Sequence, residues 1–165
     1  DSVLMESIPE FLEAKTETEY HLAILSLVAS VDDSHAAFIT KQTFNYFGNK
    51  FVPFNTSIIN GKAIVTKLLD EALCEENDIR KGDIIYTVNG KSSEDLFNEN
   101  RKYIMGSNVP AQLAKAHVFI FKGNSDEITV ILKRDQFEQT KTIKRYEWTE
   151  INKETPKNIQ KFQIL

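Results

Sequence analysis

The stretch of sequence that decides the fold is KGDIIYTVNGK, residues 81–91. Gly82 favours a turn, and the apolar run at 84–88 that follows it predicts a buried strand. The pair Asn89-Gly90 then predicts a second, tight turn, because both residues readily adopt the positive φ angles of a type I′ turn. The stretch therefore predicts a strand that is held between two sharp turns.

The residues around this stretch predict further strands and helices. A second Asn-Gly pair, at 60–61 between two apolar runs, predicts a β-hairpin. Ser92 or Ser93 can cap a helix over 93–105, since a serine side chain accepts from free backbone N–H groups. The same reasoning predicts a short helix at 71–77, a helical or buried segment at 111–121, and closing strands at 128–132 and 140–146. Residues 54–146 thus predict a small β-barrel with two or three helices.

Two helices are predicted before this region, within residues 1–31, and the fold class is therefore α+β. Pro9 is expected to start a new turn in the first helix, since proline is tolerated at the first helical position. Thr16 and Glu19 form a capping box that opens the second helix, whereas residues 36–53 show no clear period. The apolar stripes of the two helices consist of Leu4, Ile8, Phe11 and Leu12, and of Tyr20, Ile24, Leu27, Val28 and Val31.

The composition excludes several classes of protein. The chain has 165 residues and a net charge of -4, and its interspersed charges lack the clustered basic face of a nucleic-acid-binding protein. One cysteine and three dispersed histidines predict no disulfide, no metal site and no cofactor. No run approaches the ~20 apolar residues that span a bilayer. The chain starts at Asp1 and ends in an apolar patch at Leu165, so we expect a piece cut from a longer protein.

The glycine turn, buried strand, Asn-Gly turn and capped helix of residues 81–91 and beyond resemble the core signature of PDZ domains. The order of elements is similar to the PDZ domains of tail-specific (C-terminal processing) serine peptidases, whose closing strand ends in an Arg-rich sequence. Lys133-Arg134-Asp135 and Lys144-Arg145-Tyr146 resemble that ending. The resemblance covers about residues 10–146. It implies an N-terminal helical segment at 1–46, a PDZ-like domain at 47–146 and a linker at 147–165 toward a catalytic core.

The segment Asp33-Ser34-His35 is similar to the Asp-x-His segment that precedes the PDZ domain in this family. For the tricorn-like branch, the resemblance implies that His35 is the general base and that Ser34 helps to orient a remote carboxylate. In the Ser-Lys branch the matching histidine is not the base. The residues alone also allow His35 to close the preceding helix through backbone hydrogen bonds, so both interpretations remain open. No serine lies in the family's nucleophile context, so we expect the nucleophile beyond Leu165 and no hydrolysis by this chain alone.

The PDZ resemblance also implies a groove in which an extended peptide adds as a strand to a sheet edge beside a helix. The expected edge is 54–59, and the expected helix is 93–105. The loop at 48–54 departs from the family's glycine-rich carboxylate-binding loop, and residues 107–124 resemble an insertion. The candidate peptide-binding residues are Gly48, Phe51, Phe54, Ile58, Leu96 and Tyr103. The alternative is a degenerate groove that the chain's own Phe-rich loop fills.

The predicted function is that of the non-catalytic, peptide-binding or regulatory part of a tail-specific serine endopeptidase. The expected partners are a protein or peptide substrate, bound through its C-terminus, and the catalytic domain of the same parent chain. The family resemblance implies a periplasmic, cell-envelope or secreted location. One alternative is a stand-alone peptide-binding or scaffold module without a proteolytic role. Another is a module that captures partners through the helices at 1–31.

Overall fold

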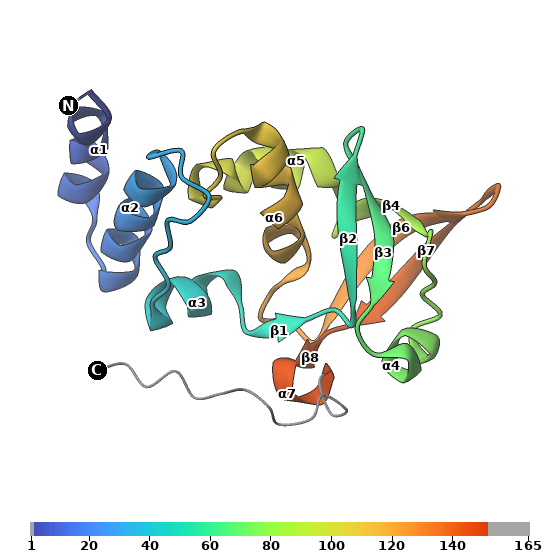
Figure 1. The fold of residues 1–165 in the computed structure, drawn as a ribbon. Coiled ribbons are helices and arrows are strands. Elements are labelled where there is room, and N and C mark those ends of the chain that lie inside the picture. Colours follow the sequence, from blue (N-terminus) through green and yellow to red (C-terminus); the bar gives the residue numbers. More distant parts are fainter. Residues whose placement is uncertain (1, 152–165) are drawn as a thin grey trace.

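The computed structural model describes residues 2–151, in which N-terminal helices precede an antiparallel sheet with further helices (Figure 1). The fold class is therefore α+β, as predicted. The helices are α1 (Ser2–Glu13), α2 (Glu17–Ala29), α3 (Lys41–Phe47), α4 (Glu71–Glu76), α5 (Ser93–Asn100), α6 (Val109–Phe121) and α7 (Trp148–Ile151), and a 3-10 turn, η1, spans Arg101–Tyr103. The strands are β1 (Lys50–Phe51), β2 (Phe54–Ile59), β3 (Lys62–Leu68), β4 (Ile84–Val88), β5 (Lys91–Ser92), β6 (Glu127–Arg134), β7 (Phe137–Lys144) and β8 (Tyr146–Glu147).

The main sheet is open, which corrects the predicted barrel. Its strands follow the order β2-β3-β4-β6-β7, and β5 pairs with β4. Within residues 2–151, the outer strands β2 and β7 do not pair with each other, so the sheet has two free edges. Closure of a barrel depends on strand number, tilt and stagger together, and the apolar pattern of single strands does not encode these quantities.

Both Asn-Gly pairs form the tight turns that the sequence predicts. Asn60 and Gly61 connect β2 to β3 with φ angles of 50° and 73°. Asn89 and Gly90 connect β4 to β5 with φ angles of 50° and 81°. Two consecutive positive φ angles are those of a type I′ turn, whose twist matches that of the flanking strands. The two pairs therefore fix the register of two strand pairings locally.

The hydrophobic core lies between the main sheet and the helices α5 and α6. Phe97 of α5 and Phe121 of α6 pack into the same cluster as Ile85 of β4 and Leu132 of β6. Burial of each such side chain contributes about 1.5–3 kcal/mol relative to exposure. The fully buried aliphatic and aromatic side chains of this core include Phe54, Phe121, Ile85, Ile104, Ile128, Leu132 and Ile143.

The N-terminal helices confirm one prediction and correct two. Thr16 Oγ1 accepts from the backbone N–H of Glu19, and the Glu19 carboxylate accepts from the N–H of Thr16, so the capping box is present. Pro9 lies inside α1 and does not begin a turn there, because the helix already starts at Ser2. Its ring nitrogen lacks the hydrogen that an i−4 carbonyl would accept, which removes one hydrogen bond from the helix.

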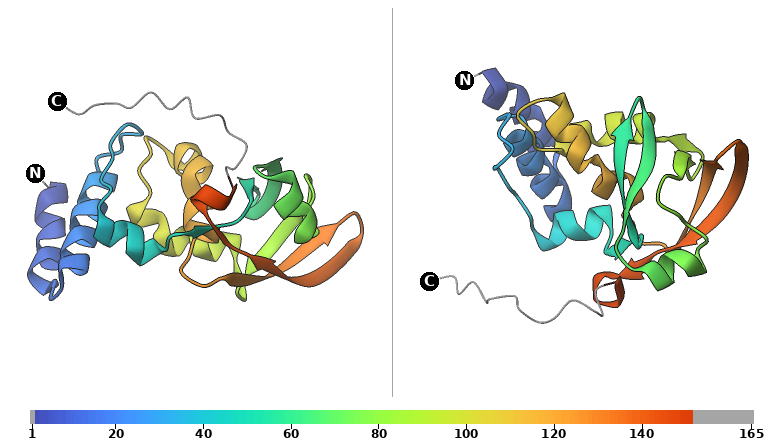
Figure 2. Two further views of the ribbon diagram at one scale, coloured as in Figure 1. Left: turned by 90° about the horizontal axis from the view of Figure 1, so that it is seen from below. Right: turned by 45° about the vertical axis from the view of Figure 1, so that its right-hand side comes forward.

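The buried face of α2 differs from the predicted stripe. Tyr20 and Val31 of that stripe are exposed. The cause is that α2 contacts α1, α3 and η1, so neighbours on more than one side decide which residues are buried. Figures 1 and 2 show α1 at the end of the helical part that is remote from the sheet. The buried residues of α2 are Leu22, Ala23, Leu25 and Ala29.

Three segments differ in extent from the predicted elements. The helix expected over 93–105 ends at Asn100 and continues as the turn η1. The expected insertion at 107–124 contains the helix α6, which contacts β2. Part of the expected linker at 147–165 is ordered as the end of β8 and α7, where Ile151 is buried, and its remainder lies outside the described residues.

Candidate functional site

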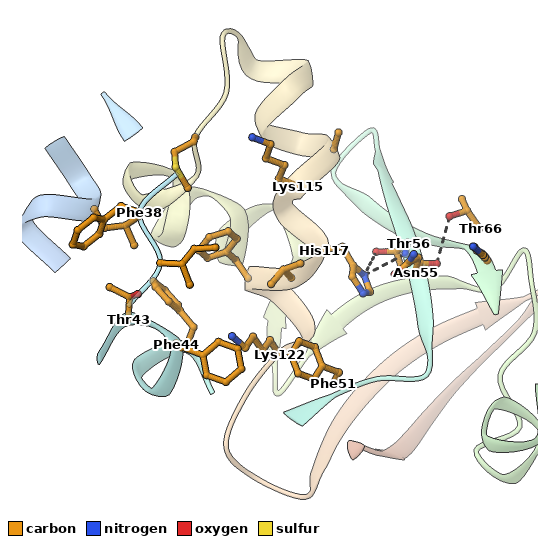
Figure 3. A pocket seen from close by; sticks show the side chains of 18 residues that line it. Phe38, Thr43, Phe44, Phe51, Asn55, Thr56, Thr66, Lys115, His117 and Lys122 are labelled. Carbon is orange, nitrogen blue, oxygen red and sulfur yellow. Dashed lines mark hydrogen bonds between the residues drawn. The ribbon is translucent and has the colours of Figure 1, made fainter. Parts of the chain in front are cut away.

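A cavity of about 830 Å³ lies between α6, the edge strand β2 and the segment that contains α3 and β1 (Figure 3). Its volume is within the range of ligand-binding pockets, and most of its wall is aromatic or aliphatic. The lining residues are Leu25, Phe38, Ile39, Thr43, Phe44, Phe47, Phe51, Asn55, Thr56, Thr66, Lys67, Met105, Ala114, Lys115, His117, Val118, Phe119 and Lys122.

His117 of α6 joins the helix to the sheet edge at one side of this cavity. Its Nδ1 accepts from the backbone N–H of Thr56 at 3.2 Å and lies 2.9 Å from the Thr56 hydroxyl oxygen (Figure 3). An Nδ1 that accepts from an N–H carries no proton, so the ring is the neutral Nε2–H tautomer. Burial lowers the pKa of His117 to about 4, which keeps the imidazole neutral near pH 7.

Lys122, at the end of α6, provides a cation at the aromatic side of the cavity. Its Nζ lies 3.7 Å from the ring centroid of Phe44 and 5.4 Å from that of Phe51. Both rings attract the ammonium through their negative faces. Burial lowers the pKa of this group, because desolvation disfavours the charged form. In the described part of the chain, no carboxylate lies within 4 Å of the Lys122 ammonium.

Of the six candidate peptide-binding residues, Phe51 alone lines the cavity. Phe54 is fully buried in the core, where it packs edge-on against Phe121. Ile58 and Leu96 are half-buried against the same core from β2 and α5. Three of the candidates thus support the sheet on which the cavity is built.

Gly48 and Tyr103 also lie outside the cavity wall. Gly48 ends α3 with a φ of 97°, and a Cβ atom there would lie 2.1 Å from the backbone carbon of Gly123. Tyr103 packs edge-on against Phe47, with the ring centroids 5.5 Å apart. Gly48 therefore permits the close approach of the end of α3 to Gly123, and Tyr103 of η1 packs against α3.

The helix beside the edge strand β2 is α6, whereas α5 contacts β3, β4, β5 and α6. The PDZ resemblance implies the helix at 93–105 at this place, and no sequence pattern indicates His117, Lys115 or Lys122 as site residues. A local signal for α6 exists, since Asn108 caps the helix and Pro110 occupies its first turn. The position of the helix against β2 depends on contacts between distant residues, which this local signal does not contain.

The loop that carries Ser34 and His35 is tied to the start of α6. Ser34 Oγ accepts from the backbone N–H of Ser107 at 3.0 Å, and the Ser34 carbonyl accepts from Lys115 Nζ at 2.8 Å. The His35 side chain is 97% exposed, and its Nδ1 lies 3.4 Å from Oδ1 of Asp33. The backbone N–H of His35 donates to the same carboxylate at 2.8 Å, which lowers the pKa of Asp33. The anchored backbone thus presents an exposed imidazole beside the Asp33 carboxylate.

Cys74 does not offer a nucleophile. Its Sγ donates to the carbonyl of Pro53 at 3.1 Å in the core, and burial raises the pKa of the thiol to about 11. Residues 2–151 contain no cluster of three His, Cys, Asp or Glu side chains that could hold a metal ion. Across the same residues, every helix is too short or too polar to cross a bilayer.

Comparison with known proteins shows similarity in fold. No family model matches the sequence, and no curated protein matches it. The structure of mature CPAF complexed with lactacystin matches with a TM-score of 0.62 and 14% identity over 87% of this chain and 28% of that chain. Mature CPAF matches with a TM-score of 0.61 and 15% identity, again over 87% of this chain and 28% of the other. The photosystem II D1 C-terminal processing protease matches with a TM-score of 0.39 and 16% identity, over 86% of this chain and 37% of that protein.

The match to CPAF includes both the helical part and the sheet, since it covers 87% of this chain. This chain therefore has the fold of a portion of CPAF and spans 28% of that chain's length.

Proposed function

We propose that this chain is the substrate-binding, non-catalytic part of a tail-specific serine endopeptidase, in which an extended polypeptide docks on the free edge of β2 beside α6. The observation that carries this proposal is one arrangement: a free sheet edge and an apolar cavity share the same flanking helix. Main-chain hydrogen bonds to such an edge give affinity, and an adjoining pocket selects side chains. The fold shared with a portion of CPAF supports the same assignment.

The docked polypeptide competes with His117 at one position of the edge. The N–H of Thr56 already donates to His117 Nδ1, so a strand that pairs there displaces the imidazole. The remaining contacts come from the apolar wall, where Val118 of α6 is 45% exposed. Binding is therefore expected to depend on this wall more than on a charged pair.

His35 has the second role in this proposal, that of a general base for a serine in the catalytic part of the parent protein. The reaction is acyl transfer: the imidazole takes the proton of the serine hydroxyl as the oxygen attacks the peptide carbonyl. The exposure of His35 on an anchored loop supports a role across a boundary between domains. A location in the cell envelope or outside the cell is part of this proposal, and the family resemblance supports it.

Peptide titration tests the docking half of the proposal. Fluorescence anisotropy would follow labelled extended peptides, each prepared as the free acid and as the amide. We expect saturable binding that Val118→Glu abolishes, because a charge in the apolar wall excludes the ligand. Phe137→Glu is the matched control, since Phe137 is 78% exposed at the start of β7 and does not line the cavity. If no peptide binds in either form, docking on β2 is wrong.

A variant of the parent protein tests the catalytic half. His35→Ala in the full-length protein should lower kcat about 10²- to 10⁴-fold, the usual contribution of a general base. The same substitution should leave the unfolding midpoint of this chain unchanged, because the side chain is 97% exposed. Full activity of the variant would assign the parent to a mechanism in which this histidine is not the base.

A stand-alone peptide-binding module is the second candidate function. It is favoured by the fact that, in the described part of the chain, all residues that line the cavity lie between Leu25 and Lys122. Peptide binding by this chain, combined with a parent protein that shows no serine-dependent hydrolysis, would select this alternative.

A further inference from the structure

Among the charged side chains that line the cavity in residues 2–151, Lys122 has a special environment. It is partly buried, and its ammonium donates to no acceptor atom of these residues. The wall contains two other lysines. Lys115 donates to the carbonyl of Ser34, and Lys67 is exposed to water. A partly desolvated ammonium without a counter-ion is unfavourable, and the two flanking aromatic rings offset only part of that cost. The Lys122 ammonium can therefore accept an anionic partner.

The charged side chains that line the cavity are of one sign in the described part of the chain. Its wall includes three lysines and no aspartate or glutamate. The potential inside such a wall favours a negative group, and an apolar surrounding strengthens that preference. Charge complementarity thus favours a ligand whose negative group binds beside Lys122.

The other hydroxyl and imidazole groups of the wall have partners within the protein. Thr43 bonds to Thr40, and Thr56 bonds to His117. The Thr66 hydroxyl donates to the carbonyl of Asn55 at 3.4 Å. A ligand body rich in amides would have to replace these bonds, whereas a hydrocarbon body leaves them intact. The wall therefore suits an apolar chain with a single anionic end.

We propose that the cavity binds a small amphipathic carboxylate, such as an aliphatic monocarboxylic acid, with its carboxylate on Lys122 and its hydrocarbon chain along α6 toward Val118 and Phe38. In this position Phe44 and Phe51 flank the ammonium, and the carboxylate contacts the ammonium away from the two ring faces. The cavity volume of about 830 Å³ accommodates a ligand of this class. The proposal goes beyond peptide docking and does not depend on it.

Isothermal titration with dodecanoate and dodecanol, both below their aggregation concentrations, tests the proposal directly. We expect 1:1 binding of dodecanoate that is about ten- to a hundredfold tighter than that of dodecanol. The reason is that the carboxylate accepts a charge-assisted hydrogen bond from Lys122, which the alcohol cannot form with the same strength. Lys122→Met should reduce dodecanoate affinity to that of the alcohol and leave dodecanol binding unchanged. Lys122→Arg should retain the preference for the acid, because it keeps the charge.

A matched control and a competing ligand make the outcomes distinct. Lys81→Met removes an exposed lysine that does not line the cavity and should change neither affinity. Equal affinities for acid and alcohol, or an unaltered preference in Lys122→Met, would overturn the proposal. So would Lys122-dependent binding of free-acid peptides without any binding of dodecanoate, a result that would assign the anion to a polypeptide and support peptide docking instead.

Discussion

The backbone N–H of Thr56 donates to Nδ1 of His117 at 3.2 Å, so a side chain of α6 occupies a hydrogen-bonding position at the free edge of the sheet. The Thr56 hydroxyl lies 2.9 Å from the same nitrogen. An unpaired strand edge is a template for another strand, and proteins protect such edges in several ways. Here one histidine protects the edge and holds the helix in place.

Removal of His117 should strengthen peptide binding. His117→Ala frees the Thr56 N–H for a docked strand, and a net hydrogen bond of about 1 kcal/mol corresponds to roughly a fivefold gain in affinity. Anisotropy titration with the peptides described above measures this gain. His21→Ala is the matched control, since His21 also bonds a threonine hydroxyl, that of Thr40, but does not line the cavity. Unchanged or weaker binding by His117→Ala would show that the imidazole does not compete with the peptide.

The same histidine should make stability depend on pH. Its pKa is about 4 in the folded chain, against about 6.5 in the unfolded chain, because burial disfavours the cation. Between these values the unfolded state binds more protons, so the stabilisation is complete above pH 6.5 and is lost as the pH falls toward 4. The full loss amounts to roughly 3 kcal/mol.

Urea denaturation at pH 7 and at pH 4.5 measures this loss. His117→Gln should show a smaller decrease in the free energy of unfolding between the two pH values, since its amide does not titrate there. Carboxylates that titrate in the same range contribute equally to both proteins and cancel in the difference. An identical decrease in both proteins would mean that His117 titrates normally.

Gly48 should tolerate no side chain. Gly48→Ala places a Cβ atom 2.1 Å from the backbone of Gly123 and also strains a φ of 97°, so we expect a loss of more than about 2 kcal/mol. Gly90→Ala has the positive φ without the clash, because nothing lies within 4 Å of its Cβ position, and should cost about 1 kcal/mol. Thermal unfolding of both variants gives the comparison. Equal losses would indicate that the two backbones separate easily at this contact.

Arg134 should be required for the stability of the fold, because it neutralises the buried carboxylate of Asp83. Its Nε and Nη2 donate to the two carboxylate oxygens of Asp83 at 2.8 Å each, and Asp83 is 1% exposed. Arg134→Met leaves that charge without its partner and should cost about 3–5 kcal/mol. Addition of Asp83→Asn should recover part of the loss, because it removes the uncompensated charge. Denaturant unfolding of the single and double variants tests this, and additive losses would contradict it.

Local sequence signals predicted the turns, the capping box and the longer strands, because each depends on a few neighbouring residues. The type I′ turns need only the backbone freedom of Asn60-Gly61 and Asn89-Gly90. The buried face of α2 was predicted wrongly, since three neighbouring elements pack on that helix and no single stripe describes its environment. The open sheet likewise depends on the relation between β2 and β7, which are far apart in the chain.

The candidate site was the least predictable part. The cavity brings together residues from Leu25 to Lys122, and sequence patterns contain no distance between such residues. Phe51 is a candidate from the sequence because its loop stands where PDZ domains have their peptide-binding loop. Lys122 is not a candidate from the sequence, since a lysine is common after the last residue of an apolar helix. The aromatic rings around it, those of Phe44 and Phe51, belong to other segments.

The pairing of β1 with β8 has a consequence for how this chain can be rearranged. Lys50 lies opposite Glu147, and Phe51 lies opposite Tyr146. The two ends of the segment that contains the whole main sheet therefore lie next to each other. A segment with adjacent ends can be replaced by a short turn, or inserted into a loop of another protein, because the remaining backbone has only a short gap to close. The covalent entry and exit of the main sheet therefore lie side by side at β1 and β8, and its further attachments to the N-terminal helices run through η1 and α6.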